Sequence, residues 1–287
     1  MIDLHVHSTA SDGTATPEEL AAMGGDFYAM ALTDHDNCDG ADAFLAACAG
    51  GGGVRLAGIE LSVAPGEGYD RFHMLGLGID PHNERLKGFL DRVLEGRMSR
   101  NGKILARFAE IGVEMPEAEL SAYAQGRIVA RPHFARWLVD HGRAADVKEA
   151  FATYLTPESP AGTNCYVARF RPDPGEAIDA IHAAGGVAVM AHPRFWTGDP
   201  AKLRAGLRRL RDRGLDGIEA VYQANSRSET VDHLIAARET GLCVTAGSDF
   251  HGKNKPSVHL GMEVDDDRTF LAPFFRRLDS RRGAAEG

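Results

Sequence analysis

The chain has 287 residues, 44% of them hydrophobic and 25% charged, which is enough for one large domain with its own core. Its formal net charge of −9 argues against a surface that coats DNA or RNA, although a small anionic substrate stays open. The four cysteines are scattered, and no apolar run reaches the roughly 18 residues of a membrane-spanning helix. With no signal peptide or disulfide framework evident, we expect a cytoplasmic protein that does not bind membranes.

Strand and helix signals alternate in the first third of the chain. The expected elements are strands at 2–6, 27–33, 54–61 and 72–79, and helices at 16–23 and 41–49. Thr16 supplies an N-cap, Pro17 occupies the first helical position, and Glu19 stands three residues past the cap. Repeated short strand–helix units predict a parallel sheet or barrel with the helices outside.

The middle of the chain, from about 83 to 164, shows helical patterns and no convincing strand. We therefore expect a helical insertion for substrate recognition at 100–164, between barrel segments at 1–99 and 165–287. Alternation then returns, with a helix that starts at 173–176, helices at 200–213 and 228–240, and strands at 187–191, 217–221, 242–246 and 258–264. About seven units favour the α/β class and a distorted TIM-like (β/α)7 barrel. The polar tail from Arg276 is expected to be frayed.

Nine residues of metal-ligand type fall at or near the ends of the predicted strands. They are His5, His7, Asp12, His35, Glu60, His73, His192, Asp249 and His251. His5 and His7 lie two apart on a strand and so face the same side, and the carboxyl ends of barrel strands share one rim. Burying so many ionisable groups without a cation would be costly. Imidazoles and carboxylates without cysteine suit manganese, with zinc or iron as alternatives.

Six short strings resemble, in order, the motifs of the PHP (polymerase and histidinol phosphatase) family. They are DLHVHS, TDHD, GIEL, FHMLG, AHP and GSDFHG, and they cover about 1–80 and 165–262. The resemblance implies a distorted seven-stranded barrel that holds two or three divalent ions. It implies one ion on His5, His7, Glu60 and Asp249, a second on Glu60, His73 and His192, and a third on Asp12, His35 and His251. Asp12 stands where several relatives have histidine, which puts the third ion in question.

The chemistry that follows is phosphoester hydrolysis. Two cations bridged by a carboxylate can hold a hydroxide at neutral pH and clamp the phosphoryl oxygens. The hydroxide attacks phosphorus in line, and we expect Glu60, Asp249 and His192 to be the catalytic residues. A Ser–His–Asp mechanism is disfavoured, because Ser8 and Ser248 lie inside the metal motifs, where we expect them to form loop hydrogen bonds.

Substrate selection is expected to depend on residues outside the ligand set. The candidates are Arg100, Arg131, His133, Arg194, Tyr222, Asn225 and Arg227. Arg100 belongs to a basic helix stripe at 97–107, for which a solvated face is the favoured interpretation. In GRIVARPHF, which also holds Arg127, Pro132 can start a helix whose N-terminus attracts phosphate. The remaining candidates follow predicted strands on the same rim as the ligands.

The insertion makes the chain similar to one branch of the PHP family, the phosphatases of 3′,5′-nucleoside bisphosphates and the 5′-exonucleases of short RNA. The leading hypothesis is release of the 3′-phosphate of a nucleoside 3′,5′-bisphosphate, which leaves a 5′-nucleotide. The expected partner is thus a small phosphorylated nucleotide, with short RNA as an alternative. The sequence is also compatible with a 5′-to-3′ exoribonuclease, a histidinol-phosphate phosphatase, an amide hydrolase and a non-enzymatic metal-binding module.

Overall fold

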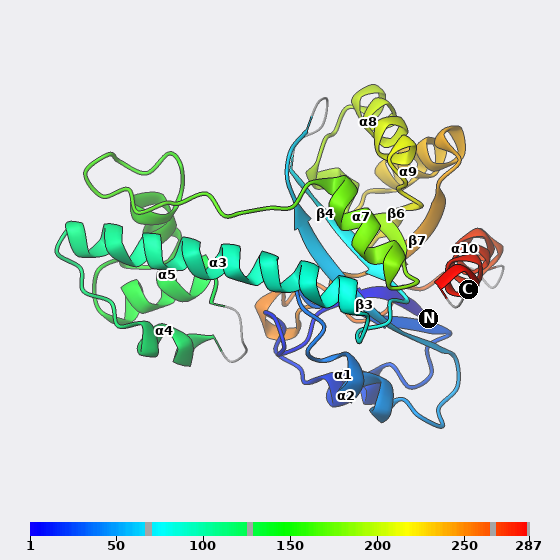
Figure 1. The fold of residues 1–287 in the computed structure, drawn as a ribbon, viewed down its shortest axis with the longest axis horizontal. Coiled ribbons are helices and arrows are strands. Elements are labelled where there is room, and N and C mark those ends of the chain that lie inside the picture. Colours follow the sequence, from blue (N-terminus) through cyan, green and yellow to red (C-terminus); the bar gives the residue numbers. More distant parts are fainter. Residues whose placement is uncertain (67–70, 125–128, 265–267, 286–287) are drawn as a thin grey trace. The chain divides into compact units, whose positions relative to one another are not determined.

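The computed structural model describes residues 1–66, 71–124, 129–264 and 268–285 of the chain. It divides into two compact units (Figure 1). The first unit joins Met1–Leu90 to Arg171–Gly287, and the second is Asp91–Phe170, which includes the segment expected as an insertion. No helix in the described ranges is both long and apolar enough to cross a membrane.

The first unit is built on seven strands that are neighbours in chain order. They are β1 (Ile2–Val6), β2 (Ala29–Leu32), β3 (Val54–Val63), β4 (Phe72–Leu77), β5 (Val187–Met190), β6 (Gly217–Tyr222) and β7 (Cys243–Gly247). A bridge between Val6 and Phe250 joins β1 to the segment after β7, so that the sheet curls into a nearly closed barrel. The expected distorted barrel of the α/β class is confirmed.

Strand β4 departs from the parallel arrangement that the sequence led us to expect. It runs antiparallel to both β3 and β5, whereas the other neighbouring pairs are parallel. Only residues 64–71 join β3 to β4, and a parallel crossover needs about a dozen residues or more. Because β4 is reversed, its first residues lie beside the last residues of β3, with His73 opposite Ser62. The reversal therefore brings His73 to the rim where β3 ends.

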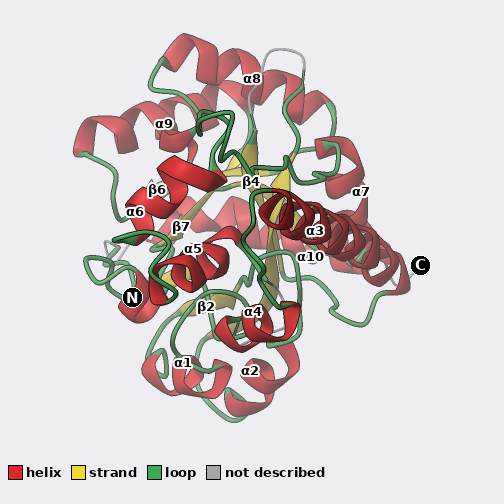
Figure 2. Cartoon of the chain, turned by 90° about the vertical axis from the view of Figure 1, so that its left-hand side faces the viewer, coloured by secondary structure: helices red, strands yellow, loops and turns green. Residues whose placement is uncertain are grey.

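Helices surround the strands of the first unit (Figure 2). They are α1 (Pro17–Met23), α2 (Ala41–Ala47), α7 (Pro174–Ala183), α8 (Pro200–Asp212), α9 (Arg227–Thr240) and α10 (Ala272–Ala285). The predicted start of α1 is confirmed, because the Thr16 hydroxyl accepts from the Glu19 amide while the Glu19 carboxylate accepts from the Thr16 amide. Such reciprocal caps satisfy amide groups that would otherwise lack partners at a helix start.

Two expectations for the end of the chain are wrong. Residues 258–264 form no strand, and their only ladder contact is an isolated bridge from Met262 to Ile2. The polar tail from Arg276 continues helix α10 as far as Ala285, and its Leu278 is buried in the barrel core with Phe274, which precedes the tail. These two side chains are four residues apart and thus share one helix face, which supplies the apolar contact that the tail's overall composition conceals.

Helices are the only regular secondary structure among the described residues of the second unit, and residues 156–170 form turns and irregular backbone. Its elements are α3 (Glu84–Glu110, which begins in the first unit), α4 (Glu117–Tyr123), α5 (Arg131–Asp140), α6 (Val147–Ala150) and a π-helical turn (Phe151–Leu155). Ile104 and Phe108 of α3 pack with Phe134 and Leu138 of α5 in a separate core. This unit therefore has its own hydrophobic centre.

Candidate metal centre

Glu60, near the end of β3, lies at the centre of a cluster of imidazoles, and its side chain is 1% exposed. Its Oε1 lies 2.9 Å from His73 Nδ1, 2.9 Å from His192 Nε2 and 3.4 Å from His5 Nε2. Its Oε2 lies 2.9 Å from His35 Nδ1 and 3.3 Å from His7 Nε2. One carboxylate thus faces five histidines contributed by several strands and by the loops that follow them, which is the arrangement of a bridging ligand.

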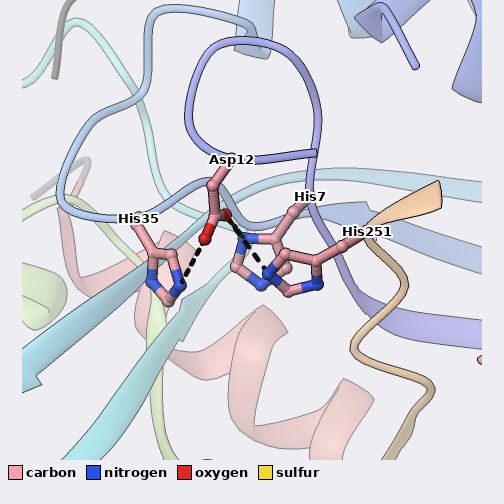
Figure 3. Close-up of side chains that lie close together, drawn as sticks. All are labelled: His7, Asp12, His35 and His251. Carbon is pink, nitrogen blue, oxygen red and sulfur yellow. Dashed lines mark ion pairs between the residues drawn. The ribbon is translucent and has the colours of Figure 1, made fainter. Parts of the chain in front are cut away.

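Three overlapping groups of ligand atoms surround this carboxylate, with the atoms of each group within 4.8 Å of one another. They are His5, His7, Glu60 and Asp249; His35, Glu60 and His73; and His7, Asp12, His35 and His251. In the last group, Asp12 lies between His35 and His251, at 3.8 and 3.2 Å from their Nε2 atoms (Figure 3). With His192 on Glu60, all nine predicted ligand residues converge on one end of the barrel.

Several atoms of this cluster are buried without a hydrogen-bond partner. They are His5 Nε2, both ring nitrogens of His7, His35 Nδ1 and Glu60 Oε2. A buried polar atom that lacks a partner costs free energy, and a cation supplies the missing partner to nitrogen and oxygen alike. The donor set of neutral imidazole and carboxylate therefore fits divalent cations of the manganese, iron or zinc type.

The charges of the cluster also suit cations. Burial acts to lower the pKa of His7, but Asp249 and Glu60 outweigh it and raise this pKa to about 9. Burial acts to raise the pKa of Glu60, and the neighbouring imidazoles, led by His35, hold it well below its usual range. The pKa of Asp249 is likewise lowered against burial, chiefly by His5. The carboxylates Glu60 and Asp249 are therefore ionised, and a cation that binds here would displace protons from His5 and His7, whose pKa values are raised.

Backbone strain is concentrated at the same place. Among the described residues other than glycine, positive φ angles occur only at Asp36 (53°), His192 (27°) and Asp249 (62°). Such conformations cost about 1–3 kcal/mol each and persist where the surroundings enforce them. Two of the three residues belong to the predicted ligand set, and the third directly follows His35. The strained positions therefore lie within or directly beside the predicted ligand set.

Glu219 of β6 is a functional residue that the sequence interpretation missed. It is fully buried, its Oε1 lies 3.0 Å from His5 Nδ1, and its Oε2 accepts from the His192 amide at 2.7 Å. A Cβ at Gly247 would lie 2.3 Å from Glu219 Oε1, so this glycine makes room for the contact. Because Nδ1 of His5 is engaged, its Nε2 is the atom presented to a cation. An acidic residue amid the apolar strand GIEAVY was the available signal.

Glu219→Gln is expected to weaken Mn²⁺ binding about 10- to 100-fold, the usual effect of removing a carboxylate that orients a ligand histidine. Calorimetric titration of the demetallated protein measures this change. Glu239→Gln on the exposed side of α9, where Glu239 pairs with Arg204, is the matched control. An unchanged Mn²⁺ affinity in Glu219→Gln would show that His5 needs no such support.

Asp249 is held by two residues that leave one of its oxygens for the cluster. Lys255 Nζ lies 2.6 Å from its Oδ2, and the Tyr222 hydroxyl donates to the same oxygen at 3.0 Å. Oδ1 faces His5 and His7 at 3.6 and 3.4 Å. Tyr222, a predicted substrate contact, is buried, and its hydroxyl contacts the ligand residue Asp249. Lys255 was not predicted, and its place in a loop offered no periodic signal.

The two serines of the metal motifs act as expected. The Ser8 hydroxyl donates to Asp34 at 2.6 Å, and the Ser248 hydroxyl donates to Asp3 at 2.6 Å. Both acceptors are buried carboxylates. The prediction that these serines form loop hydrogen bonds is confirmed.

Three further substrate candidates lie in the first unit. Arg194 follows His192-Pro193, and its guanidinium lies 3.5 Å from the Glu229 carboxylate. The Asn225 amide donates to the Ala220 carbonyl at 3.1 Å and so closes its own loop. Arg227 is exposed at the first position of α9. Of these three, Arg194 is the one that stands within two residues of a predicted ligand, His192.

The remaining candidates lie in the second unit. Arg131 begins α5 and donates to the Leu155 carbonyl at 3.1 Å, and His133 Nδ1 accepts from the Ala130 amide at 3.0 Å. Arg100 is only 5% exposed, as is Arg97, so a solvated face is wrong for these two. They share the face of α3 that carries Ile104 and Phe108 into the core. Arg127 lies outside the described residues.

Comparisons with known proteins agree with this geometry. Residues 3–130 match the model of the PHP domain family. The 3′,5′-nucleoside bisphosphate phosphatase of Chromobacterium violaceum is 33% identical over 284 residues, covering 98% of this chain and 97% of that protein. The 5′-3′ exoribonuclease Rnm of Salmonella typhimurium is 31% identical over 271 residues, covering 91% of this chain and 88% of that protein.

A solved structure extends the likeness to three dimensions. An amidohydrolase from Chromobacterium violaceum, with bound sulfate, has a TM-score of 0.79 and 32% identity, over 98% of this chain and 96% of that one. The predicted hydrolase acting on phosphoester bonds is confirmed by the relatives. The chain belongs to the PHP domain family, as its six motifs predicted.

Proposed function

We propose that the protein is a metal-dependent phosphomonoesterase that releases the 3′-phosphate of nucleoside 3′,5′-bisphosphates. The observation that carries the reaction is the convergence of nine ligand residues, with Glu60 facing five of their imidazoles and several buried atoms without a hydrogen-bond partner. The similarity to a 3′,5′-nucleoside bisphosphate phosphatase over nearly the whole chain supports the choice of substrate. We further propose two or three cations per chain, with Mn²⁺ as the native metal.

The roles of the ligand residues follow from their contacts. Bound cations would polarise the phosphoryl group and activate water for in-line attack. Glu60 faces imidazoles through both oxygens and would bridge two cations. Asp249 presents Oδ1 to the cluster because Lys255 and Tyr222 hold Oδ2. The backbone of His192 is strained, and its amide donates to the Glu219 carboxylate. The Nε2 atom of His192 lies 2.9 Å from Glu60 Oε1 and would be its cation ligand.

The test is a phosphate-release assay with the Mn²⁺-loaded protein and adenosine 3′,5′-bisphosphate. We expect inorganic phosphate and adenosine 5′-monophosphate, identified by chromatography. Adenosine 3′-monophosphate as the nucleotide product would show that the other ester is cleaved. The absence of any phosphate release would overturn the proposed substrate.

A second candidate function is 5′-to-3′ hydrolysis of short RNA, which the similarity to the Salmonella typhimurium exoribonuclease favours. A 5′-phosphorylated RNA of five nucleotides distinguishes the two. A nuclease shortens it by one nucleotide at a time from the 5′ end, whereas a strict phosphomonoesterase leaves its internal diester bonds intact.

Arg131 is our proposed recognition residue for the phosphate that is not cleaved. Charge-assisted bonds from a guanidinium to phosphate are strong and directional. Arg131→Ala should lower kcat/KM for adenosine 3′,5′-bisphosphate at least about tenfold, the lower end for a charged hydrogen bond. It should leave 4-nitrophenyl phosphate, which has no second phosphate, nearly unaffected.

The matched control for Arg131 is Arg136→Ala, which removes the same charge from an exposed position of α5. Equal losses on both substrates in Arg131→Ala would indicate damage to the fold or to catalysis, since Arg131 also contacts the Leu155 carbonyl. No loss on either substrate would place the recognition residue elsewhere.

A further inference from the structure

Phe195 ends the short 3₁₀ turn Pro193–Phe195 that follows His192. It is 66% exposed, the largest fraction among the large hydrophobic side chains in the described part of the chain. Single exposed hydrophobic residues are common and need no explanation by themselves. Phe195 differs because of its neighbours, which belong to the candidate metal centre.

Two rings of the centre flank Phe195. Its ring centroid lies 5.3 Å from that of His192 and 6.0 Å from that of Tyr222, with interplanar angles of 64° and 79°. His192 contacts Glu60 at 2.9 Å, and the Tyr222 hydroxyl contacts Asp249 at 3.0 Å. The exposed ring is therefore one side chain away from both carboxylates at the heart of the cluster.

The turn holds the ring in this exposed position. Trp196, the next residue, is only 7% exposed, and a Cβ on Gly206 of α8 would lie 2.1 Å from its ring. The amides of Phe195 and Trp196 donate to the carbonyls of His192 and Pro193, at 3.0 and 2.9 Å. The buried Trp196 side chain thus fixes the turn against the first unit, and Phe195 points away from the core.

We propose that Phe195 is a stacking platform for the base of a nucleotide, an inference that rests on the proposed function. Edge-to-face contacts with His192 and Tyr222 leave ring surface open, and the Arg194 guanidinium lies over the ring at 5.6 Å. A nucleobase offers a flat π face to such a ring whatever its sequence identity. The adjacent Arg194 adds a positive charge, which attracts the phosphate of a nucleotide.

A protein interface is the competing use of an exposed aromatic ring. Val231, Leu234 and Ile235 of α9 are also partly exposed and could extend such a surface. A partner seated on Phe195 would, however, cover His192, which contacts Glu60. Because substrate must reach these residues, a small planar ligand fits the position better than a second protein does.

The test compares ligands with and without a base, using the Mn²⁺-loaded protein. Phe195→Ala is expected to raise the calorimetric Kd of adenosine 5′-monophosphate about tenfold, in the range for the loss of one base–aromatic stack. The Kd of ribose 5-phosphate should stay unchanged. Phe195→Trp, which keeps a ring, should retain the nucleotide affinity, and Met23→Ala, at an exposed apolar position of α1, is the control.

Two outcomes would overturn the platform. An equal rise in the Kd of both ligands would mean that Phe195 acts through His192 and the cations. An unchanged Kd of the nucleotide would show that its base does not stack on Phe195. A change of molar mass by light scattering with unchanged nucleotide affinity would assign Phe195 to a protein interface. Binding of the monophosphate requires no hydrolysis, so the platform is supported by this result even if bisphosphates prove not to be substrates.

Discussion

Replacing Glu60 with glutamine is expected to lower kcat about a thousandfold, the upper end for the loss of one group that stabilises charge in a transition state. The variant should also lose at least one cation per chain. Glutamine has the same shape, but it carries no negative charge, and its amide group would face imidazoles on the side that must bind a cation. Five imidazoles contact this one carboxylate, and no other residue of the cluster contacts as many.

The measurements are steady-state kinetics and metal content by plasma mass spectrometry on the same preparation. Glu239→Gln, an exposed change of the same type, should keep both wild-type rate and wild-type metal content. A Glu60→Gln protein that retained its cations and a near-normal rate would show that the carboxylate does not bridge.

Exhaustive removal of divalent cations is expected to abolish activity, and Mn²⁺ is expected to restore it. The cluster has buried imidazole nitrogens without a hydrogen-bond partner, which a cation would satisfy, and nitrogen donors favour Mn²⁺ or Zn²⁺ over Mg²⁺. Mg²⁺ should therefore restore less activity than Mn²⁺ at equal concentration. Full activity in the demetallated protein would end the metal-dependent interpretation.

A second readout of metal removal does not depend on turnover. A ligand that binds only the folded state stabilises it by about 2.7 kcal/mol at a concentration a hundred times its Kd. The melting temperature should therefore rise when Mn²⁺ is added to the demetallated protein. The rise should be smaller in Glu219→Gln, because His5 loses the contact that orients it. An equal rise in the melting temperature of both proteins would show that Glu219 does not contribute to metal binding.

The local sequence was enough to predict most secondary structure and the composition of the centre. Alternation of short strands and helices follows from local periodicity and from caps such as Thr16, which depend on neighbouring residues only. The ligand types could also be read locally, because His5 and His7 stand two residues apart at the end of a strand, and the other ligands lie near strand ends or in the loops that follow strands. Barrel geometry then places strand ends together, so distant motifs could be expected to meet.

Tertiary structure decided what depends on the path of the chain in space. The reversal of β4 brings His73 to the rim, and it is seen in the antiparallel pairing of β4 with both β3 and β5. Glu219 and Lys255 acquire their roles only from contacts with His5 and Asp249 that depend on how strands and loops are packed. Such contacts leave no periodic trace in the sequence, because each residue's partner is set by the packing of the whole barrel.

The burial of charged and polar segments was decided in the same way. Arg100 belongs by its spacing to a basic surface stripe, but it shares a helix face with residues that form the core of the second unit. The tail from Arg276 is polar enough to predict fraying, yet its Leu278 packs in the barrel core beside the preceding Phe274. Sequence determined which residues could bind cations and in which elements they stand. The packing of apolar faces against one another then decided the rest. It determined which other side chains reach the candidate metal centre and which are buried in the hydrophobic cores.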